Sequence, residues 1–406
     1  MPDLDAELAR SRDDLFDEIT QPPLATVRRR AGALRRRKLA VRSGAAAVAL
    51  AGVAFAVVPG VTGDAPPPVA APTVAPTGTV YRDGGITING LTSIPLQIDG
   101  TLADVEFVDQ TTGYVLSECA DDCRRIARTT DGGATFTPGT LPAGAGDNLD
   151  LVGFPGGGLA LVAADGAAFT TTDGGATWQR LPAGGTAPVG TVGAGQILRY
   201  DGPRALAVWS ATRGRVGTLA RFPALDAVNW VAPAPSGDGA WWVGGTVGAE
   251  PAVAVSRDAG ASWDVRPLGT VGATVESVRV STLGPEAYAV VTGAGWARLG
   301  IFHSTDSGAT FARTGDGGGA GPAAIAGDVV PLLDGRLLAV SPGVDDPQDG
   351  DWWISADDGR TFTQARYLPM VGRIDRTVAG YVANDFFRDY AAFTRDGATW
   401  RKLEVW

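Results

Sequence analysis

The apolar positions of this 406-residue chain fall into two patterns. One long run without any charge covers residues 43–58 and continues to about Val61. From about residue 79 onward the apolar segments are short, as in Arg125-Ile-Ala-Arg-Thr and Ala252-Val-Ala-Val-Ser, and turn residues separate them. Short β-branched runs between turns are typical of strands. The pattern therefore predicts one helical span followed by a large all-β domain.

Composition agrees with a chain of many turns, because it includes 57 Gly and 27 Pro but only 19% charged residues. The formal net charge is −10. Residues 1–60 hold ten of the 34 Lys/Arg and seven of the 44 Asp/Glu, so the remainder carries a net charge of −13. An acidic body repels phosphate backbones, and we therefore expect no nucleic acid partner.

The long apolar run has the flanks of a membrane anchor, since arginines and a lysine fill residues 28–30 and 35–38 just before it. At about 1.5 Å per residue it just spans a bilayer. Positive charge on its N-terminal side places that end in the cytoplasm. A cleaved secretory signal is the alternative, although no small-x-small cleavage site lies close behind Val58. We predict a cytoplasmic basic segment at 1–38, a transmembrane helix at 39–61, a Pro-rich linker at 62–78 and an extracytoplasmic domain at 79–406.

An eight-residue phrase, Ser/Thr-x-Asp-x-Gly-x-Ser/Thr-aromatic, recurs along the β-rich part. Intact copies occupy residues 129–136, 171–178, 256–263, 304–311 and 355–362, and a copy at 394–400 is one residue short. Asp and Ser/Thr side chains bond nearby backbone N–H groups and Gly supplies a positive φ, so each copy predicts a turn between antiparallel strands. The structural residues of these turns are Asp131, Gly133, Asp173, Gly175, Asp258, Gly260, Asp306, Gly308, Asp357, Gly359 and Asp396. The closing Trp or Phe is expected to pack against a neighbouring sheet.

The phrase resembles the Asp box, or BNR repeat, of sialidases, sortilin-type receptors, some glycanases and the photosystem II assembly-factor family. This resemblance covers most of residues 100–406 and implies a β-propeller with each box between the third and fourth strands of a blade. Successive box Asp residues are 39 to 51 positions apart, except for a gap of 85 between Asp173 and Asp258. A blade without a box fits this gap, with strands at 204–209 and 215–221. We predict seven four-stranded blades, with six as the alternative.

The only two cysteines, Cys119 and Cys123, lie in one loop of the first predicted blade. Facing positions across a tight hairpin can meet disulfide geometry, and oxidation is permitted outside the cytoplasm. We predict a loop-closing disulfide, with free thiols as the alternative. Two cysteines and one histidine cannot build an ordinary structural zinc site, so we expect no metal and no cofactor.

The resemblance to sialidases raises a catalytic hypothesis. Sialidases require an arginine triad for the substrate carboxylate, and the first arginine stands in an Arg-Ile-Pro phrase near the domain start. This chain has Ser93-Ile94-Pro95 there, and serine cannot imitate a bidentate guanidinium. Sialidase activity is therefore not expected. His303 precedes a box on a predicted strand without any nucleophile pattern, and we expect a structural role for it.

These features favour a membrane-anchored, extracytoplasmic binding or assembly module whose rim loops or channel mouth engage a protein, peptide or glycan. We assign no catalytic residue, because the box aspartates already have a turn-forming role. The alternative is an extracytoplasmic glycoside hydrolase whose two carboxylates come together only in the fold.

Overall fold

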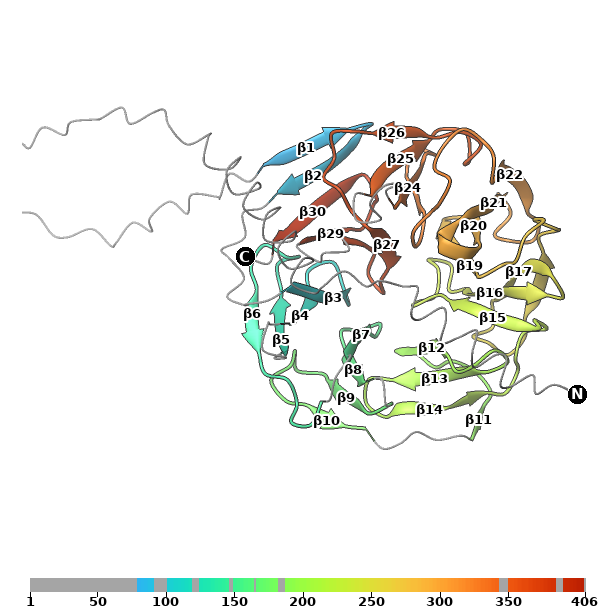
Figure 1. Ribbon diagram of the computed structural model, residues 1–406. Coiled ribbons are helices and arrows are strands. Elements are labelled where there is room, and N and C mark those ends of the chain that lie inside the picture. Colours follow the sequence, from blue (N-terminus) through green and yellow to red (C-terminus); the bar gives the residue numbers. More distant parts are fainter. Residues whose placement is uncertain are drawn as a thin grey trace, which may run out of the picture. The chain divides into compact units, whose positions relative to one another are not determined.

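The computed structural model describes residues 79–90, 101–118, 124–145, 149–163, 166–181, 187–342, 350–384 and 390–404. Within these ranges the regular structure is almost entirely β-strand, and seven sheets surround a common centre as the blades of a propeller (Figure 1). The prediction of seven blades is confirmed, and the alternative of six is wrong.

Blades 1 to 4 each have four strands, which are named from the innermost to the outermost. Blade 1 contains β3 (Thr101–Phe107), β4 (Gly113–Glu118), β5 (Arg124–Thr129) and β6 (Thr137–Gly139). Blade 2 contains β7 (Leu149–Gly153), β8 (Leu159–Ala163), β9 (Ala168–Thr171) and β10 (Gln179–Arg180). Blade 3 contains β12 (Gln196–Tyr200), β13 (Leu206–Ser210), β14 (Gly214–Leu219) and β11 (Pro188–Val189). Blade 4 contains β15 (Ala227–Val231), β16 (Trp241–Val247), β17 (Glu250–Ser256) and β18 (Asp264–Pro267).

The last three blades follow the same order. Blade 5 contains β19 (Ser277–Leu283), β20 (Glu286–Thr292), β21 (Arg298–Ser304) and β22 (Ala312–Asp316), with the short 3₁₀ helix η1 (Ala294–Trp296) between β20 and β21. Blade 6 contains β23 (Val330–Pro331), β24 (Leu337–Ser341), β25 (Asp351–Ser355) and β26 (Thr363–Ala365). Blade 7 contains β27 (Arg373–Arg376), β28 (Tyr381–Asn384), β29 (Tyr390–Thr394) and β30 (Thr399–Glu404), and β2 (Ile86–Gly90) and β1 (Val80–Asp83) extend it outward.

The repeated turns connect the third and fourth strands of six blades. Because successive strands of a blade are antiparallel, these turns share one face of the ring with the hairpins between first and second strands. We call this the turn face. The loops between second and third strands, and those between blades, lie on the other face, which we call the mouth face.

Blade 3 has no repeated turn and differs from the others. Its strands β13 and β14 lie where the sequence predicts strands at 204–209 and 215–221. The outer position is filled by β11, which precedes β12 in the chain and pairs in parallel with β14. Since no turn follows β14, the chain continues directly to blade 4, and an upstream segment covers the edge instead.

The N-terminal strands extend the outer edge of blade 7. Strand β2 pairs in parallel with β30, and β1 forms a hairpin with β2 (Figure 1). Ile86 and Ile88 point into the sheet interface and are fully buried there. The first and last described parts of the domain therefore share one sheet.

The hydrophobic core is divided into clusters between neighbouring blades. Trp400 of blade 7 packs with Trp352 of blade 6 in an edge-on arrangement, with ring centroids 5.2 Å apart, and both are almost completely buried. Phe362, the closing aromatic of a repeated turn in blade 6, lies in a cluster with Tyr288 and Ile301 of blade 5. The expectation that these aromatics pack against a neighbouring sheet is confirmed.

Three predictions lie outside the described residues: the cytoplasmic segment at 1–38, the transmembrane helix at 39–61 and the linker at 62–78. Cys119 and Cys123, and residues 93–95, also lie outside them. In the described part of the chain, no helix has the length and apolar character needed to cross a membrane.

Candidate functional site

Charged residues gather where the innermost strands converge on the centre of the ring. They alternate with buried apolar residues along these short strands, as in Asp104-Val-Glu-Phe107 of β3 and Arg373-Ile-Asp-Arg376 of β27. The full set is Asp104, Glu106, Asp150, Arg199, Arg279, Asp328, Arg373, Asp375 and Arg376. Both signs are present, so the site is polar without a single dominant charge.

Polar side chains on or beside the innermost strands join adjacent blades. Oδ1 of Asp104 accepts the backbone N–H of Val105 at 2.8 Å, and its Oδ2 accepts that of Leu151 in blade 2, also at 2.8 Å. Asn229 of blade 4 accepts the N–H of Val278 in blade 5 at 3.0 Å. Asp328, before β23, accepts the N–H of Arg376 in blade 7 at 2.8 Å. These side chains are therefore structural links between innermost strands.

Arg279 forms ion pairs that connect three blades. Its Nη1 lies 3.3 Å from Oδ2 of Asp328 and 3.5 Å from Oδ1 of Asp375. Burial alone would lower the pKa of Arg279, but these two carboxylates raise it above its ordinary value. Asp375 also receives Nε of Arg373 at 2.6 Å. Arg279 and Arg373 are thus paired with carboxylates of blades 6 and 7, whereas Oδ1 of Asp328 and Nη1 of Arg376 are buried without a hydrogen-bond partner among the described residues.

A cavity of about 420 Å³ lies beside these ion pairs, because Arg373 also lines it. It is lined by Ala103, Asp104, Glu118, Leu149, Asp150, Leu151, Val152, Arg199 and Arg373. Glu118 ends β4, whereas Asp150 and Arg373 stand near the starts of their strands, so the cavity belongs to the mouth face. We call it the mouth cavity.

The polar residues that line the mouth cavity differ in whether they already have hydrogen-bond or ion-pair partners. Both oxygens of Asp104 accept backbone N–H groups, and Glu118 pairs with Arg124 at 3.5 Å. Nη1 of Arg199 is buried and has no hydrogen-bond partner among the described residues. The guanidinium of Arg373 is half exposed and contacts Asp375 through Nε. The groups open to a ligand are therefore the Arg373 guanidinium, which donates, and the exposed carboxylate of Asp150, which accepts.

Burial changes the protonation of several channel groups. It raises the pKa of Asp104 to about 6, with Asp150 and Asp375 adding to the rise, although the N–H groups of Leu151 and Val105 oppose it. Burial also raises the pKa of Glu106 well above its ordinary value. The pKa of Arg199 is lowered because its guanidinium is desolvated, and the charge of Asp150 opposes this effect. Burial at this site therefore raises the free energy of the ionised side chains, and a ligand that forms hydrogen bonds with them can offset that cost.

The repeated turns are held by the hydrogen bonds that their sequence predicts. In the first copy, Oδ1 of Asp131 accepts the Thr129 hydroxyl at 2.8 Å and the Thr135 N–H at 2.9 Å, and its Oδ2 accepts the Thr135 hydroxyl at 2.6 Å. The N–H of Gly133, at φ +91°, donates to Oγ1 of Thr129 at 2.7 Å. The copies centred on Asp173, Asp258, Asp306 and Asp357 repeat these bonds.

The short sixth copy keeps part of this pattern. Thr394 accepts the N–H of Gly397 at 3.0 Å, and Asp396 accepts that of Thr399 at 2.8 Å. In the intact copies the carboxylate is held as an anion: the hydroxyl and N–H of Thr177 lower the pKa of Asp173 to about 2. These aspartates are thus committed to the turn face and do not line the mouth cavity.

Arginines and tryptophans fasten these turns to neighbouring blades. Nη1 of Arg401 in blade 7 donates to the carbonyls of Asp131 and Gly132 in blade 1, each at 2.6 Å. Nε of Arg266 in blade 4 donates to the Ala309 carbonyl of blade 5 at 2.9 Å. Nε1 of Trp178, which closes a turn in blade 2, donates to the carbonyl of Thr140 at 2.8 Å. Each of these bonds crosses from one blade to the next.

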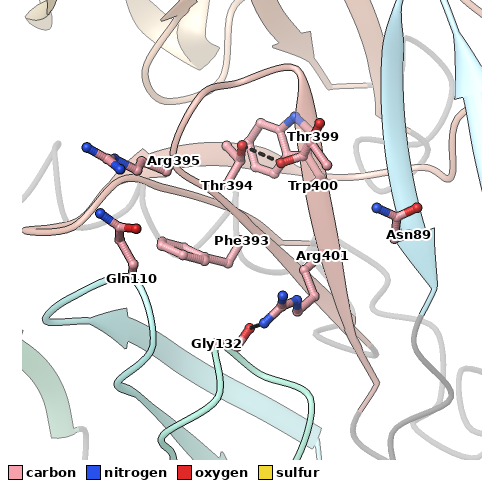
Figure 2. Close-up of a pocket in the computed structure, with 9 residues that line it drawn as sticks. All are labelled: Asn89, Gln110, Gly132, Phe393, Thr394, Arg395, Thr399, Trp400 and Arg401. Atoms are coloured by element: carbon pink, nitrogen blue, oxygen red, sulfur yellow. Dashed lines mark hydrogen bonds between the residues drawn. The ribbon is translucent and has the colours of Figure 1, made fainter. Parts of the chain in front are cut away.

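A smaller cavity of about 170 Å³ lies where the ring closes, between β2, the last repeated turn and the first one (Figure 2). Gln110 and Arg395 lie on one side of it and Asn89 on the other, while Arg401 reaches toward Gly132 below (Figure 2). The Thr394 hydroxyl beside it is used internally, because it donates to the Thr399 carbonyl at 2.7 Å. This cavity is best explained as space left by the junction of blades 7 and 1.

The sequence did not single out the residues of the mouth cavity. The available signal was the alternation of charged and buried residues in short strands, since a charge inside a central strand requires a partner. Such alternation also occurs on solvated strands, and the charges lie far apart in sequence. Asp104 and Arg373 line one cavity only because the ring brings blade 7 beside blade 1.

No family model matches this sequence, and no curated protein matches it. Similar solved structures include YCF48 bound to D1 peptide, with 16% identity, a TM-score of 0.44, and coverage of 75% of this chain and 93% of that chain. Hydrazine synthase of Kuenenia stuttgartiensis is 12% identical, with a TM-score of 0.46 and coverage of 77% and 97%. A GH74 xyloglucanase from Xanthomonas campestris is 16% identical, with a TM-score of 0.32 and coverage of 75% and 47%. At these identities the likeness concerns the propeller fold alone.

Proposed function

We propose that this chain is an Asp-box propeller that works outside the cytoplasm as a binding or assembly module, anchored by a transmembrane helix at residues 39–61. Its ligand is a polar segment of a protein, peptide or glycan, and the mouth cavity receives it. The observation that carries the proposal is a cavity of about 420 Å³ whose lining includes two arginines, Arg199 and the half-exposed Arg373.

The hydrogen-bonding capacity of the cavity indicates the chemistry of the ligand. The guanidinium of Arg199 packs over the Trp209 ring at 5.3 Å, and its desolvation is a cost that a ligand acceptor at this wall would offset. Arg373 adds a second group of donors at the same cavity, while Asp104 and Glu118 are already occupied. Carbonyl, hydroxyl and carboxylate oxygens are the matching acceptors, and peptides and glycans present them in rows.

Binding can be tested by incubating the full-length protein with peptide and glycan arrays and measuring Kd for the strongest hit. Arg199→Gln and Arg373→Gln should each weaken binding by about tenfold or more, since each removes a charged hydrogen-bond donor. Arg204→Gln is the matched control, because Arg204 is exposed, pairs with Asp226 at 3.4 Å and does not line the cavity. Equal affinity in all three variants, or no binding to either array, would contradict the proposal.

A glycoside hydrolase is the second candidate, because two of the three carboxylates that line the mouth cavity lie in different environments. Asp104 has its pKa raised to about 6 by burial, whereas Asp150 is exposed to the cavity. A carboxyl group with a raised pKa beside a second carboxylate is a pattern found in glycosidases. Against it, both oxygens of Asp104 accept backbone N–H groups and are poorly placed to transfer a proton.

A glycan-hydrolysis screen separates these two functions. Turnover by the wild-type protein that is lost in both Asp104→Asn and Asp150→Asn would favour the hydrolase. We expect no turnover, together with array binding that depends on Arg199.

Topology and the disulfide are proposals with their own tests. Proteolysis of intact cells should remove the propeller and leave a short membrane-bound fragment, whereas a mature protein lacking residues 1–61 would indicate a cleaved signal. Mass spectrometry without reduction should find Cys119 and Cys123 joined in one loop, and a pair of free thiols would contradict that.

A further inference from the structure

Trp296 is an exposed tryptophan on the mouth face, at the tip of the hairpin between β20 and β21 of blade 5. It is 37% exposed, whereas every other tryptophan in the described ranges is buried or partly buried. A tryptophan stabilises a fold mainly through the large apolar area that it buries. Core packing therefore does not explain why a tryptophan stands at this tip.

The backbone at Trp296 belongs to a turn type that ordinarily selects glycine. The N–H of Ala297 donates to the carbonyl of Ala294 at 3.2 Å. The two residues between them, Gly295 and Trp296, have positive φ angles of +62° and +61°. This is the pattern of a type I′ turn, in which Asn and Gly are strongly preferred at the central positions. Trp296 therefore carries backbone strain that a glycine would avoid.

The remaining side-chain-bearing residues with positive φ in the described part of the chain share one explanation. Ala259, Ser307 and Asp358 occupy the same position in three of the repeated turns. Trp296 lies outside any repeated turn, so the turn motif does not account for its conformation. Backbone strain of this kind clusters at binding sites, where it orients a functional side chain. The strain and the exposure of Trp296 thus point to a ligand.

Backbone hydrogen bonds hold the hairpin tip in place. The carbonyl of Trp296 accepts the N–H of Ile325 at 3.0 Å. Two residues further along β21, the N–H of Arg298 donates to the carbonyl of Ala323 at 2.8 Å. Residues 323–325 belong to the connection that leads from blade 5 to blade 6. The indole is therefore presented by a fixed backbone, which lowers the entropic cost of binding a ligand.

Small residues fill the segments beside the hairpin tip. Residues 293–295 of the hairpin are Gly-Ala-Gly, and a Cβ on Gly293 would lie 3.0 Å from the carbonyl oxygen of Thr274, which ends the sequence Gly-Ala-Thr. On the other side, the carbonyl of Gly319, within Gly-Gly-Gly-Ala at 317–320, accepts Nη2 of Arg298 at 3.0 Å. Residues 272–274, 294–295 and 317–320 are exposed. These segments therefore place no large side chain beside the indole and leave backbone polar groups accessible near it.

We propose that Trp296 is a stacking subsite for a sugar ring, so that the mouth face binds a glycan. A pyranose ring has a face of C–H groups that can pack on an indole, and hydroxyls at its edge that can bond to backbone N–H and C=O groups. Peptides are instead recognised through pockets for alternate side chains or through grooves with several aromatics, which the small residues around Trp296 do not provide. The subsite goes beyond the proposed function, since no residue of 293–298 lines the mouth cavity.

Calorimetric titration of the full-length protein with soluble β-1,4-linked hexasaccharides of glucose, xylose, mannose and N-acetylglucosamine tests the subsite. At least one of them should bind wild type, and Trp296→Gly should weaken that binding by about tenfold or more. Tyr200→Ala is the matched control, because Tyr200 is 53% exposed but ends β12 on the turn face, and it should bind like wild type. Equal affinity of wild type and Trp296→Gly would overturn the proposal. So would a wild type that binds none of the four sugars, even if it binds peptides through Arg373 as the proposed function allows.

The stability of Trp296→Gly distinguishes a ligand-binding tryptophan from a structural one. Glycine suits the positive φ, so urea unfolding should give a folded-to-unfolded ratio equal to that of wild type or up to about fivefold higher. A ratio several-fold below that of wild type would show that Trp296 holds the hairpin together, and would overturn the proposal. Trp296→Phe keeps a flat ring and should retain part of the affinity for the sugar. A loss as complete as that in Trp296→Gly would contradict stacking.

Discussion

Oδ2 of Asp104 in blade 1 accepts the backbone N–H of Leu151 in blade 2 at 2.8 Å, and this bond joins two innermost strands beside the mouth cavity. The same carboxylate is desolvated enough for its pKa to rise to about 6. One residue thus links the blades and also carries a charge that the channel stabilises poorly. Structural and electrostatic roles can be separated because only the second depends on pH.

The free energy of unfolding of Asp104→Asn, relative to that of wild type, should be higher at pH 7.5 than at pH 4.5. The folded-state pKa of Asp104 lies above its ordinary value of 3.8, so the folded protein binds a proton more tightly than the unfolded chain. Wild-type stability from this group is therefore present at low pH and lost as pH rises through about 6. Asparagine stays neutral throughout. Urea unfolding at both pH values measures the difference, and a variant penalty that does not depend on pH would contradict this account.

Asp131→Ala should destabilise the propeller by about 2 kcal/mol, because it removes the acceptor of several bonds within the first repeated turn. Asp131→Asn retains one carbonyl oxygen, which can still accept the bonds made by Oδ1, and should cost about half as much. Chemical denaturation of the three proteins gives the ranking. If the two variants were equally unstable, the charge of Asp131 and not its turn geometry would be the important factor.

Gly133→Ala should cost about 3 kcal/mol, whereas Gly156→Ala should cost about 1 kcal/mol. Both glycines have similar positive φ angles, +91° and +94°. A Cβ on Gly133 would lie 2.3 Å from Cδ2 of buried Leu403, but a Cβ on Gly156 would meet nothing within 4 Å. The pair therefore separates backbone strain from collision between blades. Thermal unfolding of both variants tests this, and equal losses would show that strain alone matters.

The repeated turn could be predicted from sequence because it is local. The Ser/Thr, Asp and Gly that form it lie within five residues, and their hydrogen bonds do not depend on the rest of the domain. The spacing of the repeated turns predicted the number of blades, including one blade without such a turn between Asp173 and Asp258. A fold built on a repeated local motif of this kind can therefore be predicted from a single sequence.

The mouth cavity and the outer strands could not be predicted in the same way. The parallel strand β11 has only two residues and no pattern of its own, and its place is set by the exposed edge of β14. Arg199 and Asp150 approach each other because blades 2 and 3 are adjacent, not because of their spacing. Long-range neighbours of this type follow from ring geometry, which the repeat implies without specifying the side chains at the centre.

Packing of blade 7 against blade 6 should depend on Ile88 of β2. Ile88 lies opposite Trp400 in the parallel pair of β2 and β30, and it is fully buried in the cluster that contains Trp352 and Trp400. Ile88→Ala should therefore lower the free energy of unfolding by about 3 kcal/mol, since it opens a cavity between blades 6 and 7.

Thr87→Ala is the matched control for this prediction. Thr87 points to the opposite face of β2, and its backbone N–H, which donates to the Ala398 carbonyl at 2.8 Å, survives the substitution. Its cost should stay below about 1 kcal/mol. Tryptophan fluorescence during urea unfolding measures both variants, and limited proteolysis should cleave Ile88→Ala faster near residue 90. If Ile88→Ala were as stable as Thr87→Ala, β2 would be only a cover on the outer edge of blade 7, without a part in its packing against blade 6.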